Sequence, residues 1–92
     1  MRTISYTRAF KRDYRREQSG RYARKLDTIL MDIVNALAKD TALPPRNHDH
    51  ALIGNWSDHR DCHIQPDLIL IYRKIDNTVE LVRLGSHSEL GL

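Results

Sequence analysis

Ionisable side chains of three kinds recur along the second half of the chain, at spacings that favour a shared site. Asp61 and His63 are two residues apart, so they project from the same face of a β-strand. Asp67 follows in a Pro-Asp turn, and Arg83 and His87 lie four residues apart near the last predicted strand. If these segments form a meander, their polar faces bring histidines, carboxylates and an arginine to one cleft.

This set of side chains suits the cleavage of an RNA strand. The chain shows no glycine-rich phosphate loop and no serine or cysteine nucleophile in this set, and RNA cleavage needs neither because the substrate's own 2′-hydroxyl is the nucleophile. The protein must supply a base for that hydroxyl, an acid for the leaving 5′-oxygen and a cation for the phosphate. Histidine suits both proton transfers near neutral pH, and arginine suits the phosphate. His50, on the loop that leads to the same sheet edge, adds a third histidine, and no metal is required.

A metal site is the main chemical alternative. His48-x-His50 and His59-x-x-x-His63, with the two aspartates near them, have residue types that bind transition metals. However, a spacing of four residues converges on a helix, whereas this segment alternates like a strand. We therefore expect no metal and no cofactor. His48 and His59 are expected to be ordinary surface side chains, and Asp61 could equally be a structural partner of a nearby arginine.

Residue patterns predict the elements that must position these side chains, in the order β-α-α-β-β-β. Thr7 is a good helix N-cap, and apolar residues at helical spacing make the second helix the clearest element. Two prolines end that helix, and the apolar block after the Pro-Asp turn is typical of a strand buried on both faces. The predicted ranges are a strand at 2–6, helices at 8–18 and 21–39, a short extended piece near 50–52, and strands at 59–65, 68–75 and 79–86.

These elements predict a single domain over residues 1–92 with an α+β fold. A small, mostly antiparallel sheet would carry a helical hairpin on one face. The other face is then open, and the candidate site is expected there. Along the last strand, Val79, Leu81, Arg83, Gly85 and His87 have the same parity and are expected to share one face.

The composition favours an intracellular protein with a polyanionic partner. The sequence has no apolar signal segment and no run of about 20 apolar residues, and its one cysteine excludes an internal disulfide. We therefore expect a cytoplasmic protein without membrane contact. Nine of the fifteen lysines and arginines fall in the first 25 residues. Such a basic patch favours nucleic acid, although a solvated helix face would look the same.

Specific motifs extend from position 50 almost to the end of the chain. They are His50, Leu52-x-Gly54-x-Trp56, Arg60-Asp61-x-His63, Pro66-Asp67, Ile69-Leu70-Ile71-Tyr72, Arg83-x-Gly85 and His87. These motifs closely resemble those of the YafQ toxins of bacterial type II toxin–antitoxin systems, which belong to the RelE/ParE superfamily. The resemblance covers nearly the whole chain, and the block from 50 to 72 carries most of its specificity.

This resemblance implies a RelE-like fold and a ribosome-dependent mRNA endoribonuclease. Such a toxin enters the ribosomal A site and cleaves the message there by attack of the 2′-hydroxyl. A cognate antitoxin keeps it inactive in a hetero-oligomer. The implied active-site residues are His50, Asp61, His63, Asp67 and His87, with Arg83 on the phosphate and the first helix, through Arg8, Lys11, Arg12, Arg15 and Arg16, facing ribosomal RNA. His87 would be the general acid, and His50 or His63 the base.

The resemblance is incomplete at the C-terminus. The family carries an aromatic residue after the final histidine that stacks on a base, and the last five residues, Ser88-Glu89-Leu90-Gly91-Leu92, contain none. A preference for adenine-rich lysine codons is therefore an expectation from the family alone.

Two functions of other classes compete with the nuclease. The first is a ParE-like inhibitor of a protein target such as gyrase, which has no need for histidines grouped around an arginine. The second is a non-catalytic RNA-binding module supported by the basic helix. Such a module usually stacks bases on aromatic residues, and this chain has only one Phe and one Trp.

Overall fold

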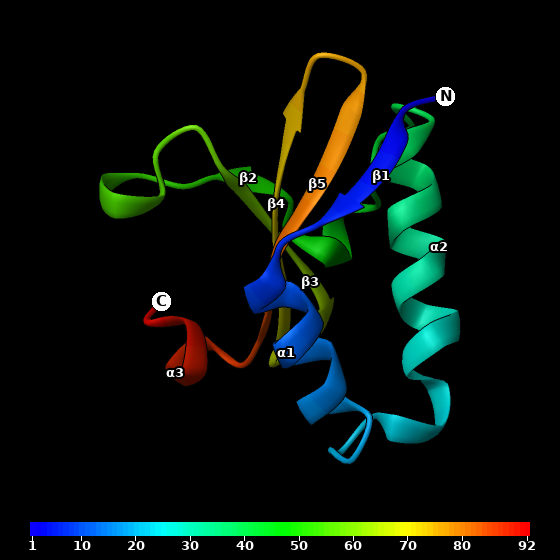
Figure 1. Cartoon of the computed structure of the whole chain (residues 1–92), viewed down its shortest axis with the longest axis vertical. Helices are drawn as coiled ribbons and strands as arrows, with labels where there is room; N and C mark the ends of the chain where they lie inside the picture. Colours follow the sequence, from blue (N-terminus) through cyan, green and yellow to red (C-terminus); the bar gives the residue numbers. More distant parts are fainter.

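A five-stranded sheet in the order β1-β5-β4-β3-β2 organises the chain, and the computed structural model describes all residues, 1–92 (Figure 1). The strands are β1 (Thr3–Tyr6), β2 (His50–Ala51), β3 (Arg60–Gln65), β4 (Leu68–Ile75) and β5 (Thr78–Gly85), and the helices are α1 (Arg8–Glu17), α2 (Leu26–Ala38) and α3 (His87–Leu90). Short 3-10 turns occupy Ala23–Lys25, Pro45–Asn47 and Gly54–Trp56. Only β1 and β5 run parallel, so the predicted α+β fold with a mostly antiparallel sheet is confirmed.

The starts of the two long helices depend on whether a capping side chain is available. The Thr7 hydroxyl accepts a hydrogen bond from the Phe10 amide at 2.9 Å, so α1 starts at Arg8 as predicted. No side chain caps the chain at Tyr22, and the residues after it form a 3-10 turn. The predicted start of the second helix at position 21 is therefore wrong, because the α-helix begins at Leu26.

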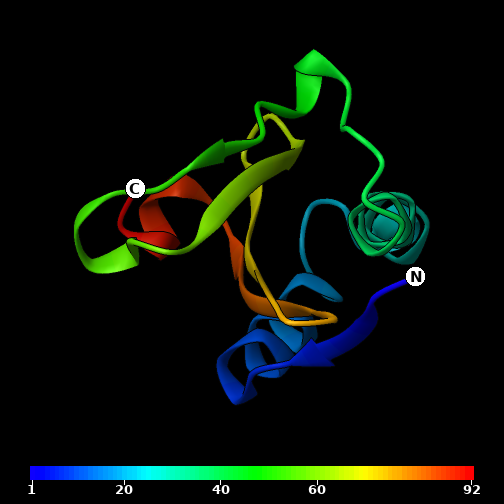
Figure 2. The ribbon, with the colours of Figure 1, turned by 90° about the horizontal axis from the view of Figure 1, so that it is seen from above.

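Both long helices bury their apolar sides against the same face of the sheet. The resulting core joins Phe10 of α1 and Val34 of α2 to Cys62, Leu70 and Leu84 of the central strands. Figure 2 shows α2 on one side of the sheet and α3 on the other. Because side chains alternate along β3, Cys62 faces the long helices and its neighbours Asp61 and His63 project away from them. None of the helices is long and apolar enough to cross a membrane.

The second face of the sheet, which was predicted to be open, is only partly open. Ile69, Ile71 and Val82 form a smaller core with Leu90 of α3, and Trp56 in the loop before β3 packs against it. β4 is therefore buried on both faces, as its unbroken apolar run predicted. The cover comes from α3, a short helix that the sequence pattern did not indicate.

A β-bulge in β5 changes which of its residues face the helices. Ile71 of β4 pairs with Arg83, whereas the next residue, Tyr72, pairs with Leu81, so Val82 is the extra residue. Leu81 lies in the core beneath the helices, and Val82 packs on the opposite face. After the bulge it is an even-numbered residue, Leu84, that faces the helices. The prediction that the odd-numbered residues from 79 to 87 share one face is therefore wrong.

Candidate active site

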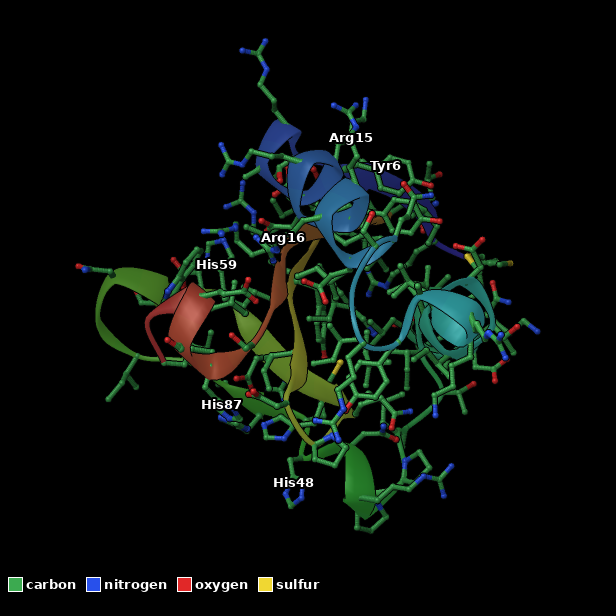
Figure 3. The ribbon with its side chains drawn as sticks, turned by 90° about the horizontal axis from the view of Figure 1, so that it is seen from below. Tyr6, Arg15, Arg16, His48, His59 and His87 are labelled. Carbon is green, nitrogen blue, oxygen red and sulfur yellow. The ribbon has the colours of Figure 1, made fainter.

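Three histidine rings lie in contact where β3, α3 and the loop before β2 meet. His63, half-buried on β3, is central, because its ring centroid lies 5.1 Å from that of His48 and 5.1 Å from that of His87. Figure 3 shows His48 and His87 close together, away from the labelled arginines of α1. The structure thus brings His63 and His87 together as the sequence suggested. His48, which was expected to be an ordinary surface residue, joins them.

Asp67 holds the His87 ring from the turn between β3 and β4. Its Oδ1 atom lies 2.8 Å from His87 Nδ1 and accepts a hydrogen bond from the His87 amide at 3.1 Å. These backbone and side-chain hydrogen bonds hold the pKa of Asp67 below its ordinary value of 3.8, so the carboxylate is charged at neutral pH. With Nδ1 engaged by Asp67, the Nε2 atom of His87 is left to exchange a proton with a substrate.

Asp61 is a buried carboxylate beside the histidines. Only 3% of its surface is exposed, and its Oδ1 atom lies 3.1 Å from His50 Nδ1. That nitrogen is closer, at 2.7 Å, to the carbonyl oxygen of His48, so the carboxylate oxygen makes no hydrogen bond of its own. Burial raises the pKa of Asp61 above its ordinary value of 3.8, and the charges of His50, His63 and His87 partly oppose the rise. Asp61 therefore favours a positive charge on the histidines around it.

The pKa of His63 is lowered from its ordinary value of 6.5. Burial of the ring is the main cause; the neighbouring Asp61 opposes it, and the other histidines, His87 first among them, add to the fall. The ring is therefore neutral at neutral pH. A neutral imidazole next to a second imidazole whose Nδ1 is held by a carboxylate is the arrangement that a base and an acid require.

The loop before β2 carries two side chains that fasten it and two that reach the site. Asn47 donates a hydrogen bond to the His63 carbonyl oxygen at 2.8 Å. Asp49 accepts hydrogen bonds from the Tyr72 hydroxyl at 2.6 Å and from Arg60 Nε at 3.2 Å. The alternating sequence 47–50 thus turns its odd-numbered residues to the protein and its histidines to the site. This alternation was the available signal for Asn47 and Asp49, which the sequence analysis missed.

A polar cavity of about 460 Å³ opens beside His48 and His63. Arg46, Asn47 and Gln65 contribute to its lining. Its volume falls within the range of sites that hold small ligands, so a nucleotide next to the histidines has room there.

Arg83 is held by an acidic partner that the sequence analysis did not predict. Its Nε atom donates to Asp13 Oδ2 at 2.6 Å and its Nη2 atom donates to Asp13 Oδ1 at 3.3 Å. Asp13 lies on α1, is fully buried and also accepts a hydrogen bond from the Leu84 amide at 3.0 Å. The bulge in β5 explains this arrangement, because it changes the direction of Arg83 relative to a regular strand.

The basic residues of α1 fall into two groups. Arg8, Lys11, Arg12 and Arg15 are exposed along the helix. Arg16 instead contacts three carboxylates of the protein, Asp13, Glu17 and Glu89, at 3.0, 3.0 and 3.1 Å. Its charge is thus compensated within the chain.

The remaining candidates lie outside the histidine group. His59 packs its ring edge on Trp56 at 5.4 Å, and its Nδ1 atom lies 3.2 Å from the Ser57 carbonyl oxygen. Cys62 faces the core beneath the helices, where burial raises the pKa of its thiol, so it is no nucleophile. No three His, Cys, Asp or Glu side chains are arranged to hold a metal ion.

Comparisons with known proteins give one consistent result. The family model described as "Bacterial toxin of type II toxin-antitoxin system, YafQ" matches residues 2–91. An Escherichia coli relative named mRNA interferase toxin YafQ is 32% identical over 90 residues, which cover 97% of this chain and 95% of that protein.

Solved structures agree with this match along the whole chain. A copper-bound mutant toxin from Helicobacter pylori is 36% identical with a TM-score of 0.86, over 98% of this chain and 99% of that one. The E. coli DinJ–YafQ toxin–antitoxin complex matches at 32% identity and a TM-score of 0.81, over 97% and 96% of the two chains.

Proposed function

The chain belongs to the YafQ family of bacterial toxins of type II toxin–antitoxin systems, and we propose that it is an endoribonuclease that cleaves mRNA in the ribosomal A site. The observation that carries this proposal is the contact of His63 with His87, at 5.1 Å between ring centroids, beside two carboxylates. Two imidazoles this close can present their free ring nitrogens to the same phosphodiester. A protein that only binds gyrase or RNA has no use for them.

His63 is the proposed base and His87 the proposed acid. The neutral His63 ring takes the proton of the 2′-hydroxyl, and the 2′-oxygen attacks the adjacent phosphorus. The bond from phosphorus to the 5′-oxygen then breaks, and that oxygen takes a proton from His87 Nε2. The products are a 2′,3′-cyclic phosphate and a 5′-hydroxyl. The lowered pKa of His63 and the charged Asp67 beside His87 support this division of roles.

His50 and Asp61 are assigned supporting roles in the proposed reaction. The buried Asp61 carboxylate lies 3.1 Å from His50 Nδ1, and the His48 carbonyl oxygen lies 2.7 Å from the same nitrogen. These contacts orient the His50 ring, whose Nε2 atom would then be the nitrogen available to the substrate. His48, in contact with His63, would act in the same way or contact the flanking nucleotide in the adjoining cavity.

Arg83 is the proposed phosphate ligand, although Asp13 neutralises part of its charge. Asp13 engages Nε and Nη2 of the guanidinium, which leaves Nη1 as the donor for a phosphate oxygen. A paired arginine holds its remaining donor in a fixed direction, which suits a site that must position one phosphate.

The proposed chemistry uses no metal, because the nucleophile, the base, the acid and the charge stabilisation all come from the substrate or from side chains. The copper-bound Helicobacter pylori relative raises the question for this chain. In this chain the rings of His48 and His87 both lie in contact with that of His63. We expect cleavage to survive chelation on ribosomes whose magnesium is restored, and a requirement for added copper or zinc would contradict this.

Two kinds of partner follow from the proposal. A cognate antitoxin would hold the chain inactive in a hetero-oligomer, as the solved DinJ–YafQ complex supports for the E. coli relative. On the ribosome, exposed Arg8, Lys11, Arg12 and Arg15 would contact rRNA phosphates, which gives affinity without sequence information. Arg16 was included in this set by the sequence analysis, and its three internal carboxylate contacts support a different role.

The test is to map messenger RNA ends by primer extension after the chain is induced in cells. The parent is expected to produce discrete in-frame cuts, and His87→Ala is expected to produce none while it still binds the antitoxin. His59→Ala is the matched control, because His59 lies outside the histidine group. Intact messages with damaged DNA would instead support the gyrase-type function.

A further inference from the structure

The segment that carries His87 is too short to hold its own shape. α3 has four residues, and a single helical turn is unstable in isolation. Its N-terminus is closed by a capping box, in which the Ser86 amide donates to Glu89 Oε1 at 2.9 Å and the Glu89 amide donates to Ser86 Oγ at 3.1 Å. On one side Leu90 anchors it in the smaller core. Asp67 holds the His87 amide and ring. A further anchor, between α3 and the end of β5, would fix the orientation of the whole segment.

Arg16 of α1 provides that further anchor from the opposite end of the chain. Its Nη2 atom donates to the Leu84 carbonyl oxygen at 2.8 Å, and its Nε atom lies 3.1 Å from Glu89 Oε2. One guanidinium therefore contacts both Leu84, the residue before Gly85, and Glu89, whose side chain completes the capping box of α3. Its Nη1 atom donates to the fully buried Asp13 at 3.0 Å, so both terminal nitrogens of the guanidinium are held by the protein.

Gly85 has no side chain because the guanidinium occupies that space. A Cβ atom on Gly85 would lie 2.8 Å from Arg16 Nη2 and 3.1 Å from Glu89 Oε1, both closer than ordinary contacts. The backbone of Gly85 does not adopt the left-handed conformation that would favour glycine, so the effect of an added Cβ atom is steric: it must displace the tip of Arg16. The Arg-x-Gly motif that ends β5 thus has a specific physical reason.

We propose that Arg16, Gly85 and Glu89 form a clamp that positions α3 and so holds His87 in contact with His63. The proposal rests on the proposed nuclease function for its kinetic consequence. The clamp residues are positioning residues and do not touch the substrate. Loss of the clamp lets His87 move relative to His63, and a misplacement of about 1 Å can cost about 100-fold in rate. The expected signature is a fall in kcat with little change in KM.

Three substitutions break the clamp from different directions. Arg16→Ala removes the guanidinium. Glu89→Gln keeps the capping box, which accepts glutamine, but removes the charge that pairs with Arg16. Gly85→Ala leaves both charges in place and pushes the Arg16 tip aside. The control is Arg73→Ala, which removes a comparable arginine–glutamate pair, Arg73 to Glu80 at 2.6 Å, remote from the histidines.

The first measurement is the NMR titration of the His87 ring in the free, labelled protein. The clamp predicts that all three variants shift or broaden the His87 ring signals and change its titration, while Arg73→Ala leaves them as in the parent. This measurement does not depend on any cleavage activity. Parent-like His87 signals in Glu89→Gln and Gly85→Ala would overturn the clamp, even if Arg16→Ala failed to fold.

The second measurement is single-turnover cleavage of ribosome-bound message. The clamp predicts at least a tenfold loss of kcat in each of the three variants. Because Arg16 and Glu89 act through one contact, the double variant Arg16→Ala/Glu89→Gln should have about the same kcat as the less active of its two single variants. A rise in KM alone for Arg16→Ala, with Glu89→Gln unchanged, would overturn the clamp and assign Arg16 to rRNA binding. If the parent does not cleave messages at all, the proposed function fails, and the NMR result still decides the clamp.

Discussion

His63 lies between two other imidazoles, and this neighbourhood limits how many of the three can be charged at once. Two like charges about 5 Å apart repel by roughly 3 kcal/mol at an effective dielectric constant of about 20, and solvent around His48 and His87 reduces this value. Burial of the central ring and the neighbouring histidines lower the pKa of His63, and Asp61 opposes the fall. At neutral pH His63 is therefore the neutral ring that a general base requires.

The pH dependence of cleavage follows from the lowered pKa of His63. As the base, His63 must be neutral, and its pKa lies below 6.5, so the acidic limb of the pH–rate profile is expected to have its midpoint below pH 6.5. The rate then decreases only as the pH falls through the lower pKa. Single-turnover rates between about pH 5 and 8 on ribosomes check this sign. An acidic limb centred above 6.5 would contradict the assignment of His63 as base.

His48 and His59 are both loop histidines that the sequence could not distinguish, and they offer a matched pair of substitutions. His48 packs on His63, whereas His59 packs on Trp56 and contacts a backbone carbonyl. His48→Ala is expected to lower the cleavage rate by roughly 10-fold to 100-fold, and His59→Ala to leave it within about twofold. Equal rates for the two variants in the same ribosome assay would remove His48 from the site.

At the scale of the elements, α1 is attached to β5 by a buried carboxylate as well as by apolar packing. Asp13 accepts hydrogen bonds from Arg16, from Arg83 and from the Leu84 amide on the bulged strand. The bulge therefore has a structural reason, because it presents a backbone amide and an arginine to the same carboxylate. Through these hydrogen bonds Asp13 fixes the direction of the Arg83 side chain and also holds the Arg16 guanidinium of the clamp.

Removal of the Asp13 carboxylate is expected to destabilise the fold. Asp13→Ala leaves Arg83 and Arg16 without their shared partner, and the loss of one member of a buried pair costs about 3 kcal/mol. Urea unfolding followed by circular dichroism measures this difference, with Asp32→Ala on α2, which is exposed, as the control. If Asp13→Ala lowered the free energy of unfolding by less than about 0.5 kcal/mol, the Asp13 ion pairs would orient the two arginines without stabilising the fold appreciably.

The contribution of Asp13 to stability also has a defined pH window. Burial favours the protonated form, but the hydrogen bonds from Arg83 and Leu84 and the charges of Arg83 and Arg16 outweigh it and hold the pKa of Asp13 below 3.8. A carboxyl group with a lowered folded pKa stabilises the protein fully above its unfolded value of about 3.9. That stabilisation is expected to be lost as the pH falls through the folded value. Acid unfolding of the parent should contain this step, and unfolding of Asp13→Ala should lack it.

Across the whole molecule, the basic helix and the histidine group lie on separate parts of the surface (Figure 3). Four exposed basic residues of α1 are available to contact phosphates, while the histidine group lies where β3, α3 and the loop before β2 meet. Affinity for a large polyanion and the chemistry on one phosphate are thereby assigned to different regions. Substitution of one of these four exposed residues should leave the chemistry at the histidines intact.

Salt dependence tests this separation. Each phosphate contact that is lost should reduce the slope of log affinity against log salt by about 0.7 to 1, so Arg8→Ala and Arg12→Ala are each expected to weaken ribosome binding and flatten that slope. Cleavage at saturating ribosome concentration should remain within about twofold of the parent. Lys74→Ala, which removes a cation paired with Asp40 far along the sheet, is the control. An unchanged slope would exclude the first helix from the ribosomal contact.

The sequence by itself determined the fold class and most of the strands and helices, and it singled out most of the candidate residues. Alternation along β3 and the apolar run of β4 indicated the faces correctly, because the period of a strand is a local property. Thr7 marked the start of α1 for the same reason. The family was evident from motifs at fixed spacing, and the fold that they implied is the fold observed.

Only the tertiary structure decided which candidates meet. A single bulge shifted the parity of β5, and a short capped helix, not a strand, carries His87 to His63. Asp13 and Arg16 acquired their roles through contacts with residues about 70 positions away. Such roles depend on packing between distant segments, where no local period applies, so the partners of a charge cannot be derived from its neighbours in the sequence.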